Sequence, residues 1–168
     1  MPSAALLRTC NYIEAAVTDD LDILVSFDRA ADQSTTGLIS LAPVFSYLKS
    51  RGYEEFRNEG VVIEGWPVQF LPVASPLDAE ALAHADEIEI QFENTVGAIK
   101  TRILRPEYLI TIALRVGRPK DLIRMAQFLE EGAVDLKALC RLLGLHGLDE
   151  RWRTFCFRTG IANPCDVG

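Results

Sequence analysis

Residues 18–25 read Thr18-Asp19-Asp20-Leu21-Asp22-Ile23-Leu24-Val25, so that acidic residues open an apolar run. If this run is a β-strand, side chains alternate between its faces, and the carboxylates of Asp20 and Asp22 leave the same face. Their Cα atoms would lie roughly 6.5–7 Å apart, at twice the rise per residue. Carboxylates at this spacing can share one or two Mg²⁺ ions, which take oxygen ligands and hold substrate phosphates. The alternative interpretation is that these acids only solubilise a strand end.

The other face of this strand carries Leu21, Ile23, Val25 and Phe27, which predicts one side that packs on a core. The whole chain has 168 residues, of which 49% are hydrophobic and 24% charged, as in one globular domain or a domain with a small helical appendix. Its formal net charge of −7 argues against a general attraction to nucleic acid.

Targeting signals are not evident in the sequence. The stretch from Met1 to Asn11 lacks the long apolar segment of a signal peptide. No run approaches the roughly 18 apolar residues that a membrane helix needs. We therefore expect a cytoplasmic protein with no membrane partner.

The cysteines show no C-x-x-C spacing, and both histidines lie far from them in the sequence, so a zinc site is not expected. We expect reduced, partly buried thiols. The residues concerned are Cys10, Cys140, Cys156 and Cys165, with His84 and His146.

The hydrophobic pattern predicts an α/β order of elements. Strands are expected at 21–27, 61–63, 68–71, 88–92 and 98–104, a polar loop at 28–37, and helices at about 38–50 and 76–85. The Glu64-Gly65 pair predicts a hairpin turn, and Ser75-Pro76 predicts a helix cap followed by the first helical residue. Four further helices are expected from Pro106 to Gly117, Pro119 to Gly132, Asp135 to Gly144, and about 149–157, before a loose tail at 159–168.

Two other polar groups are candidates for phosphate chemistry. Gln69 lies on the strand at 67–72, where its amide oxygen could bind a metal but its neutral side chain could not act as a general base. It could equally be an ordinary polar residue on a half-exposed strand. Arg118 and Lys120 accompany the exposed N–H groups of a helix start, which suits phosphate. Asp121 is favoured there by the helix dipole, and the alternative is a solvated helix start with a capping carboxylate.

These segments resemble the DNA-polymerase-beta-like nucleotidyltransferase superfamily. Residues 18–25 look like its metal-binding strand, and Gly65-Trp66-Pro67-Val68-Gln69-Phe70-Leu71-Pro72 looks like the strand that follows. Residues 105–110 and 117–122 resemble the helical segment of its bacterial AbiEii-type toxin branch. The resemblance covers roughly residues 12–131, most of the chain.

The resemblance implies an α/β (α+β) fold with a mixed, partly antiparallel sheet flanked by helices. Its expected parts are an α/β core at 1–105, a helical C-terminal subdomain at 106–158 and a tail at 159–168. It also implies transfer of a nucleoside monophosphate from an NTP to the hydroxyl of an RNA, protein or small-molecule acceptor. The implied partners also include an antitoxin of a toxin–antitoxin system, or a second copy, at the C-terminal helices.

The resemblance assigns roles to the candidate residues. Asp20 and Asp22 would bind Mg²⁺ or Mn²⁺ and act in catalysis with Gln69. Arg118 or Lys120 would contact the triphosphate or pair with Asp121.

The chain also departs from the family pattern. Residues 1–10 contain no glycine, so the Gly-Ser element that cradles the NTP phosphates is missing, and this stretch is too short for the usual strand and helix. Either the start is truncated or the element is lost. Gln69 stands where the family has a third acid, and Ala113, with only Arg115 near, stands where the toxin branch has a lysine. Two hypotheses follow: an active enzyme, or a degenerate relative that serves as a nucleotide-binding or protein-interaction module.

Overall fold

The computed structural model describes residues 3–6, 20–26, 40–57, 59–91 and 98–166. The chain is mixed α+β with a helical C-terminal part, which confirms the predicted fold class. It divides into two compact units, which we call the sheet unit, with described residues up to Leu104, and the helical unit, with those from Arg105 onward. Our expectations for Asp19, Cys10, Phe27 and the polar loop at 28–37 lie outside the described residues.

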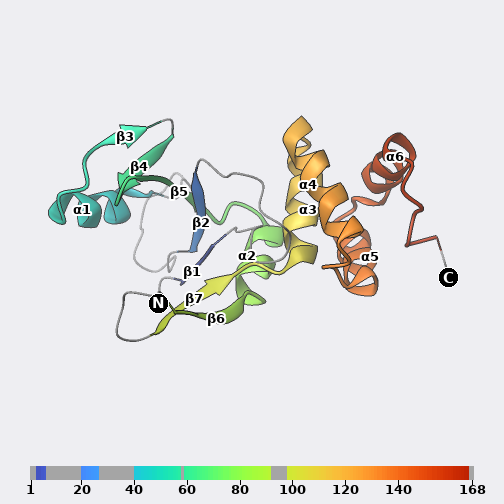
Figure 1. The fold of residues 1–168 in the computed structure, drawn as a ribbon, viewed down its shortest axis with the longest axis horizontal. Coiled ribbons are helices and arrows are strands. Elements are labelled where there is room, and N and C mark those ends of the chain that lie inside the picture. The colour runs from blue at the N-terminus through green and yellow to red at the C-terminus, as the bar shows by residue number, and fades with distance from the viewer. Residues whose placement is uncertain (1–2, 7–19, 27–39, 58, 92–97, 167–168) are drawn as a thin grey trace. The chain divides into compact units, whose positions relative to one another are not determined.

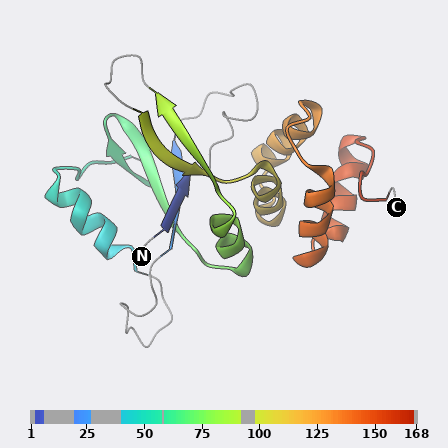
Figure 2. The ribbon, with the colours of Figure 1, turned by 90° about the horizontal axis from the view of Figure 1, so that it is seen from below.

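The sheet unit is built on one mixed sheet of seven strands in the described residues, in the order β3-β4-β5-β2-β1-β7-β6 (Figures 1 and 2). The β2–β5 and β1–β7 pairs are parallel, and the other neighbouring pairs are antiparallel. The strands are β1 Ser3–Leu6, β2 Leu21–Ser26, β3 Phe56–Arg57, β4 Gly60–Ile63, β5 Trp66–Pro72, β6 Asp86–Gln91 and β7 Ala98–Ile103.

Strand β1 was not among the strands expected from the sequence. Ser3–Leu6 pairs with β2 along its whole length and meets β7 on its other side. Its four residues lie within a short apolar run that periodicity alone cannot assign. As a result β2, the strand with the acidic start, has a neighbouring strand on each side.

The burial of β2 differs from a simple one-sided pattern. Leu24 and Val25 point to opposite faces, yet they are only 4% and 6% exposed. Helix α2, Pro76–Ala83, packs against β1 and β2 and contributes to this cover. The expectation of a single buried face was therefore incomplete, because Leu24 shares a face with Asp22 and is also in the core. The carboxylates lie at the half-buried start of the strand.

Two helices flank the sheet. Helix α1, Ala42–Ser50, buries Leu48, and the ring of its Phe45 lies 5.9 Å, centroid to centroid, from Phe56 on β3. Helix α2 begins as the sequence predicts, since Ser75 Oγ accepts the backbone N–H of Asp78 at 3.2 Å and Pro76 is the first helical residue.

The β4–β5 hairpin turns at Glu64-Gly65, as predicted. Both turn residues have positive φ, 48° for Glu64 and 86° for Gly65, as a two-residue type I′ turn requires. The Glu64 carboxylate accepts a hydrogen bond from the hydroxyl of Tyr53 at 2.6 Å, and this bond helps to hold Glu64 in a conformation that glycine adopts more readily. The same hydrogen bond, together with the negative charge of Glu64, raises the pKa of Tyr53.

The helical unit contains α3 Pro106–Val116, α4 Pro119–Glu130, α5 Leu136–Leu145 and α6 Asp149–Thr159. Helix α3 packs against α4 and α5, and α5 packs against α6. The predicted starts are confirmed, but Gly144 lies within α5 rather than ending it. The chain reverses at Gly147, whose φ is 65°. None of the helices in the described residues combines the length and apolar character that a membrane crossing requires.

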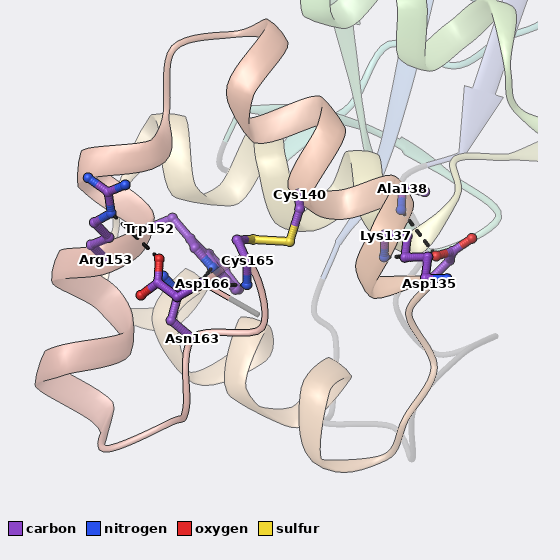
Figure 3. The surroundings of a disulfide bond; sticks show 9 residues. All are labelled: Asp135, Lys137, Ala138, Cys140, Trp152, Arg153, Asn163, Cys165 and Asp166. Carbon is purple, nitrogen blue, oxygen red and sulfur yellow. Dashed lines mark hydrogen bonds and ion pairs between the residues drawn. A yellow bond between two sulfur atoms is a disulfide. The ribbon is translucent and has the colours of Figure 1, made fainter. Parts of the chain in front are cut away.

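A disulfide joins Cys140 on α5 to Cys165 (Figure 3). The expectation of reduced thiols is wrong for this pair, and only Cys156 is a free, buried thiol among the described cysteines. The bridge spans 25 residues, and the fold brings the two Cα atoms to 5.4 Å. No local spacing encodes such a contact, which is why the sequence did not indicate it.

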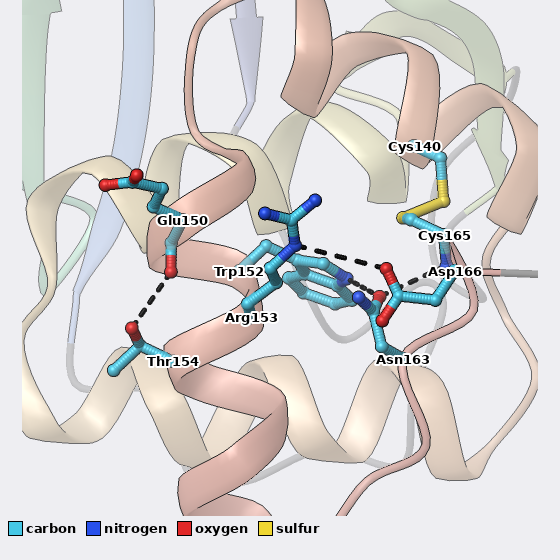
Figure 4. A network of polar contacts seen from close by, with 8 residues as sticks. All are labelled: Cys140, Glu150, Trp152, Arg153, Thr154, Asn163, Cys165 and Asp166. Atoms are coloured by element: carbon cyan, nitrogen blue, oxygen red, sulfur yellow. Dashed lines mark hydrogen bonds and ion pairs between the residues drawn. A yellow bond between two sulfur atoms is a disulfide. The ribbon is translucent and has the colours of Figure 1, made fainter.

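Residues 160–166, which follow α6, are held in place and do not form the loose tail that we expected. Asn163 Oδ1 accepts the indole N–H of the buried Trp152 at 2.9 Å and the backbone N–H of Cys165 at 3.1 Å. Asp166 lies 4.0 Å from Arg153 Nε (Figure 4). We call residues 160–166 the C-terminal strap.

Replacing Glu107 by alanine is expected to lower the free energy of unfolding by about 1–3 kcal/mol, because a part-buried donor loses its charged acceptor. Glu107 is 8% exposed, and its Oε1 accepts the backbone N–H of Asp135, the N-cap of α5, at 2.7 Å. Urea unfolding followed by circular dichroism would measure the change.

Glu150→Ala is the matched control, since Glu150 occupies the same second position of α6 that Glu107 occupies in α3, but is exposed. We expect a change of less than about 0.5 kcal/mol. Equal losses in the two variants would show that the link to α5 contributes nothing beyond the helix-dipole effect.

Candidate functional site

The register of the sheet brings two of the predicted site residues together. In the parallel β2–β5 ladder Asp22 is paired with Gln69, so their side chains leave the same face side by side. Both residues are half-buried, and Oδ1 of Asp22 is screened from solvent. Asp20 lies just before the first residue of β2 and is also half-buried.

Glu59 is an acidic residue that contacts Gln69 and was not predicted from the sequence. It lies in the tight turn between β3 and β4, and its Oε2 accepts the amide N–H of Gln69 at 2.9 Å. This bond fixes the orientation of the amide and leaves Oε1 of Gln69 as the acceptor that could face an ion. No local pattern indicates Glu59, because the contact depends on how β4 pairs with β5.

The donor set fits Mg²⁺ or Mn²⁺. Carboxylate and amide oxygens are hard ligands, and Mg²⁺ commonly uses one or two carboxylates and keeps several water molecules. Asp22 supplies a carboxylate oxygen that is already withdrawn from solvent. Within the described ranges no cluster of three or more His, Cys, Asp or Glu residues forms a metal cage.

Gly60→Ala is expected to destabilise the sheet unit by about 1–3 kcal/mol through overpacking. A Cβ atom at Gly60 would lie 2.9 Å from the backbone N of Val68 and 3.1 Å from its carbonyl carbon and oxygen. Val68 pairs with β4 on one side and with β2 on the other, so its backbone cannot shift easily to make room for the added Cβ atom. The urea midpoint would measure the loss.

Gly144→Ala is the control for this substitution. Its Cβ would meet Asp149 Oδ1 at 3.8 Å, an ordinary contact, and Gly144 lies within helix α5. Alanine should therefore be neutral or stabilise by up to about 1 kcal/mol. A Gly60→Ala protein as stable as the native chain would mean that the β4 and β5 backbones are not packed as closely as described.

The other predicted residues lie in the helical unit, at the start of α4. Arg118 is the N-cap, and Lys120 is the second helical residue; both are exposed. Asp121 Oδ2 accepts the backbone N–H of Arg118 at 3.3 Å, so this carboxylate caps the helix.

A cavity of about 340 Å³ lies beside this helix start, between the end of α3, the start of α4 and α6. Its wall is largely apolar, and the charged Glu150, Arg151 and Arg158 contribute to it. The guanidinium group of Arg151 donates a hydrogen bond to the backbone carbonyl of Arg115 at 2.7 Å, so this cation caps the C-terminal end of α3.

A scan against protein-family models finds no match to this chain, and a search of the curated proteins finds no matching protein either. The relation to nucleotidyltransferases therefore remains a prediction from the motifs.

Proposed function

We propose that this chain is a Mg²⁺- or Mn²⁺-dependent nucleotidyltransferase-like protein that transfers a nucleoside monophosphate from an NTP to an acceptor hydroxyl. The observation that supports it best is the register of the interior parallel pair, which sets Asp22 beside Gln69 with Asp20 just before the strand. This arrangement gathers oxygen donors at one end of a strand whose other end is anchored in the core.

In this proposal Asp20 and Asp22 hold the ion, which when bound would neutralise phosphate charge and orient the reacting groups. Gln69 contributes a neutral oxygen whose direction is set by the hydrogen bond to Glu59. Arg118 and Lys120 are the triphosphate contacts that the family resemblance implies. Asp121 supports them by capping the helix that they begin.

The alternative is a degenerate nucleotidyltransferase fold that binds a nucleotide or a protein without catalysis. It is favoured by Gln69, because an amide cannot take the acceptor's proton, and general-base help is worth about 10²–10⁴ in rate. A module of this kind would bind an antitoxin or a second copy of the chain through the C-terminal helices. Several large apolar side chains are exposed there, namely Ile123, Leu136, Leu145 and Phe157.

A cytoplasmic location also remains a proposal. In the reducing cytoplasm disulfides are usually transient or redox-sensing, so a cytoplasmic location implies that the Cys140–Cys165 disulfide is of this kind.

The deciding experiment incubates the full chain with each radiolabelled NTP, with Mg²⁺ or Mn²⁺, and with total RNA or a protein extract as the source of acceptor. The enzyme hypothesis expects label in one acceptor fraction and its loss on adding EDTA. Calorimetric binding of Mg²⁺-NTP without any transfer would favour the module. A partner protein that co-purifies with the chain, without NTP binding, would favour the protein-interaction form of the module. The absence of transfer, of NTP binding and of a co-purifying partner would together overturn both hypotheses.

A further inference from the structure

We propose that the Cys140–Cys165 disulfide is a redox latch that holds the C-terminal strap over Cys156, so that reduction releases the strap locally and uncovers this thiol. The latch would make the helical unit responsive to a dithiol reductant of the thioredoxin class. It is independent of the nucleotidyltransferase proposal, because every group in it lies within the helical unit.

The strap covers one face of α6. Trp152 and Arg153 on this helix contact Asn163 and Asp166 of the strap, respectively (Figure 4). Cys156 lies one helical turn after these two residues, four positions from Trp152 and three from Arg153, and side chains at these spacings share a face. Cys156 is 4% exposed, and it lies on the face of α6 that the strap contacts.

Burial and the charge of the strap both act on the Cys156 thiol. Burial raises the pKa of its thiol, and the negative charge of Asp166, next to Cys165, raises it further. Both effects favour the neutral thiol over the reactive thiolate. In the proposed closed state, burial and the charge of Asp166 therefore both keep the Cys156 thiol unreactive, and the Asp166 contribution comes from the strap.

The disulfide is the strongest link between the strap and the rest of the unit. The Arg153–Asp166 pair is 4.0 Å long and both side chains are more than half exposed, so it contributes little. The Trp152–Asn163 hydrogen bond is one neutral contact. Cys140 and Cys165 are only half-buried, which leaves a reductant access to the bridge.

Reduction of the Cys140–Cys165 disulfide requires two electrons, which a dithiol supplies. One reductant thiolate attacks Cys165 Sγ, the Cys140–Cys165 bond breaks, and Cys140 leaves as a thiolate that takes up a proton. The second reductant thiol then displaces Cys165 from the mixed disulfide. The protein gains two thiols, and the reductant becomes its cyclic disulfide.

The test uses the full chain with Cys10→Ser, oxidised, and a short pulse of N-ethylmaleimide before and after dithiothreitol, with mass mapping of each cysteine. We expect no labelling of Cys140, Cys156 or Cys165 before reduction. After reduction we expect all three to be labelled, with Cys156 at least ten times faster than before, and an unchanged far-UV circular dichroism spectrum. Cys165→Ser should expose Cys156 without reductant.

Asn163→Ala is the control, since it removes the hydrogen bonds that Asn163 accepts from Trp152 and from the backbone N–H of Cys165, and keeps the disulfide. Its oxidised form should protect Cys156 nearly as well as the parent does. The proposal fails if Cys156 stays protected after reduction, if Asn163→Ala exposes it as much as reduction does, or if Cys140 is labelled before reduction. Loss of helical signal on reduction would also overturn it, because the opening would then be global unfolding.

Discussion

Asp22→Asn is expected to slow metal-dependent nucleotidyl transfer by about 10²-fold or more. The substitution keeps the size of the side chain and removes the charge that would hold the cation. A bound metal supplies several kcal/mol of transition-state stabilisation, and each 1.36 kcal/mol corresponds to a factor of about ten in rate. Because Asp22 lies beside the neutral Gln69 in the ladder, its β5 neighbour cannot replace the lost charge. The initial rate at saturating NTP, measured over a range of Mg²⁺ concentrations, would show the effect.

Asp149→Asn provides the control for that measurement. Asp149 is exposed in the first turn of α6, so the same chemical change there should alter the rate less than about twofold. Calorimetric titration with Mg²⁺-NTP measures binding without turnover. Asp22→Asn should weaken this binding, whereas Asp149→Asn should not. Native rates and affinities in Asp22→Asn would remove Asp22 from the proposed site.

Trp152→Ala is expected to lower the free energy of unfolding by about 3–5 kcal/mol, the usual range for deleting a buried aromatic side chain. Trp152 is 1% exposed, and its ring centroid lies 5.3 Å from that of Phe155. Its indole N–H also anchors the strap through Asn163. Chemical unfolding followed by far-UV circular dichroism would measure the loss, because most helices belong to the helical unit.

Phe157→Ala is the matched comparison on the same helix. Phe157 is 89% exposed, so removing its ring should change the stability by less than about 0.5 kcal/mol. A loss of several kcal/mol in Phe157→Ala, or of less than about 1 kcal/mol in Trp152→Ala, would contradict the described packing of α6.

Local signals account for the parts of the fold that could be predicted from the sequence. Ser75 and Pro76 start α2, Pro119 starts α4, and Glu64-Gly65 turns the hairpin. Each of these features depends on residues within a few positions of one another. Gly144 shows the limit of such signals, because the helix continues past it and the chain reverses only at Gly147.

Contacts between distant residues could not be predicted in the same way. Gln69–Glu59, Cys140–Cys165 and Glu107–Asp135 join residues 10, 25 and 28 positions apart. Their partners become defined only when strands register and helices pack. The candidate site is a mixture of the two cases: Asp22 could be singled out from a local pattern, whereas the role of Glu59 required the fold.

The pairing of β1 with β7 also has a consequence for biosynthesis. Leu6 lies opposite Ile103, so β1 cannot complete its pairing until β7, the last of the described strands, has been made. Contacts so distant along the chain form slowly, whereas the helices that follow pack mainly on near neighbours. The interval between the synthesis of β1 and that of β7 is therefore when the nascent chain is most exposed to aggregation and most dependent on chaperones.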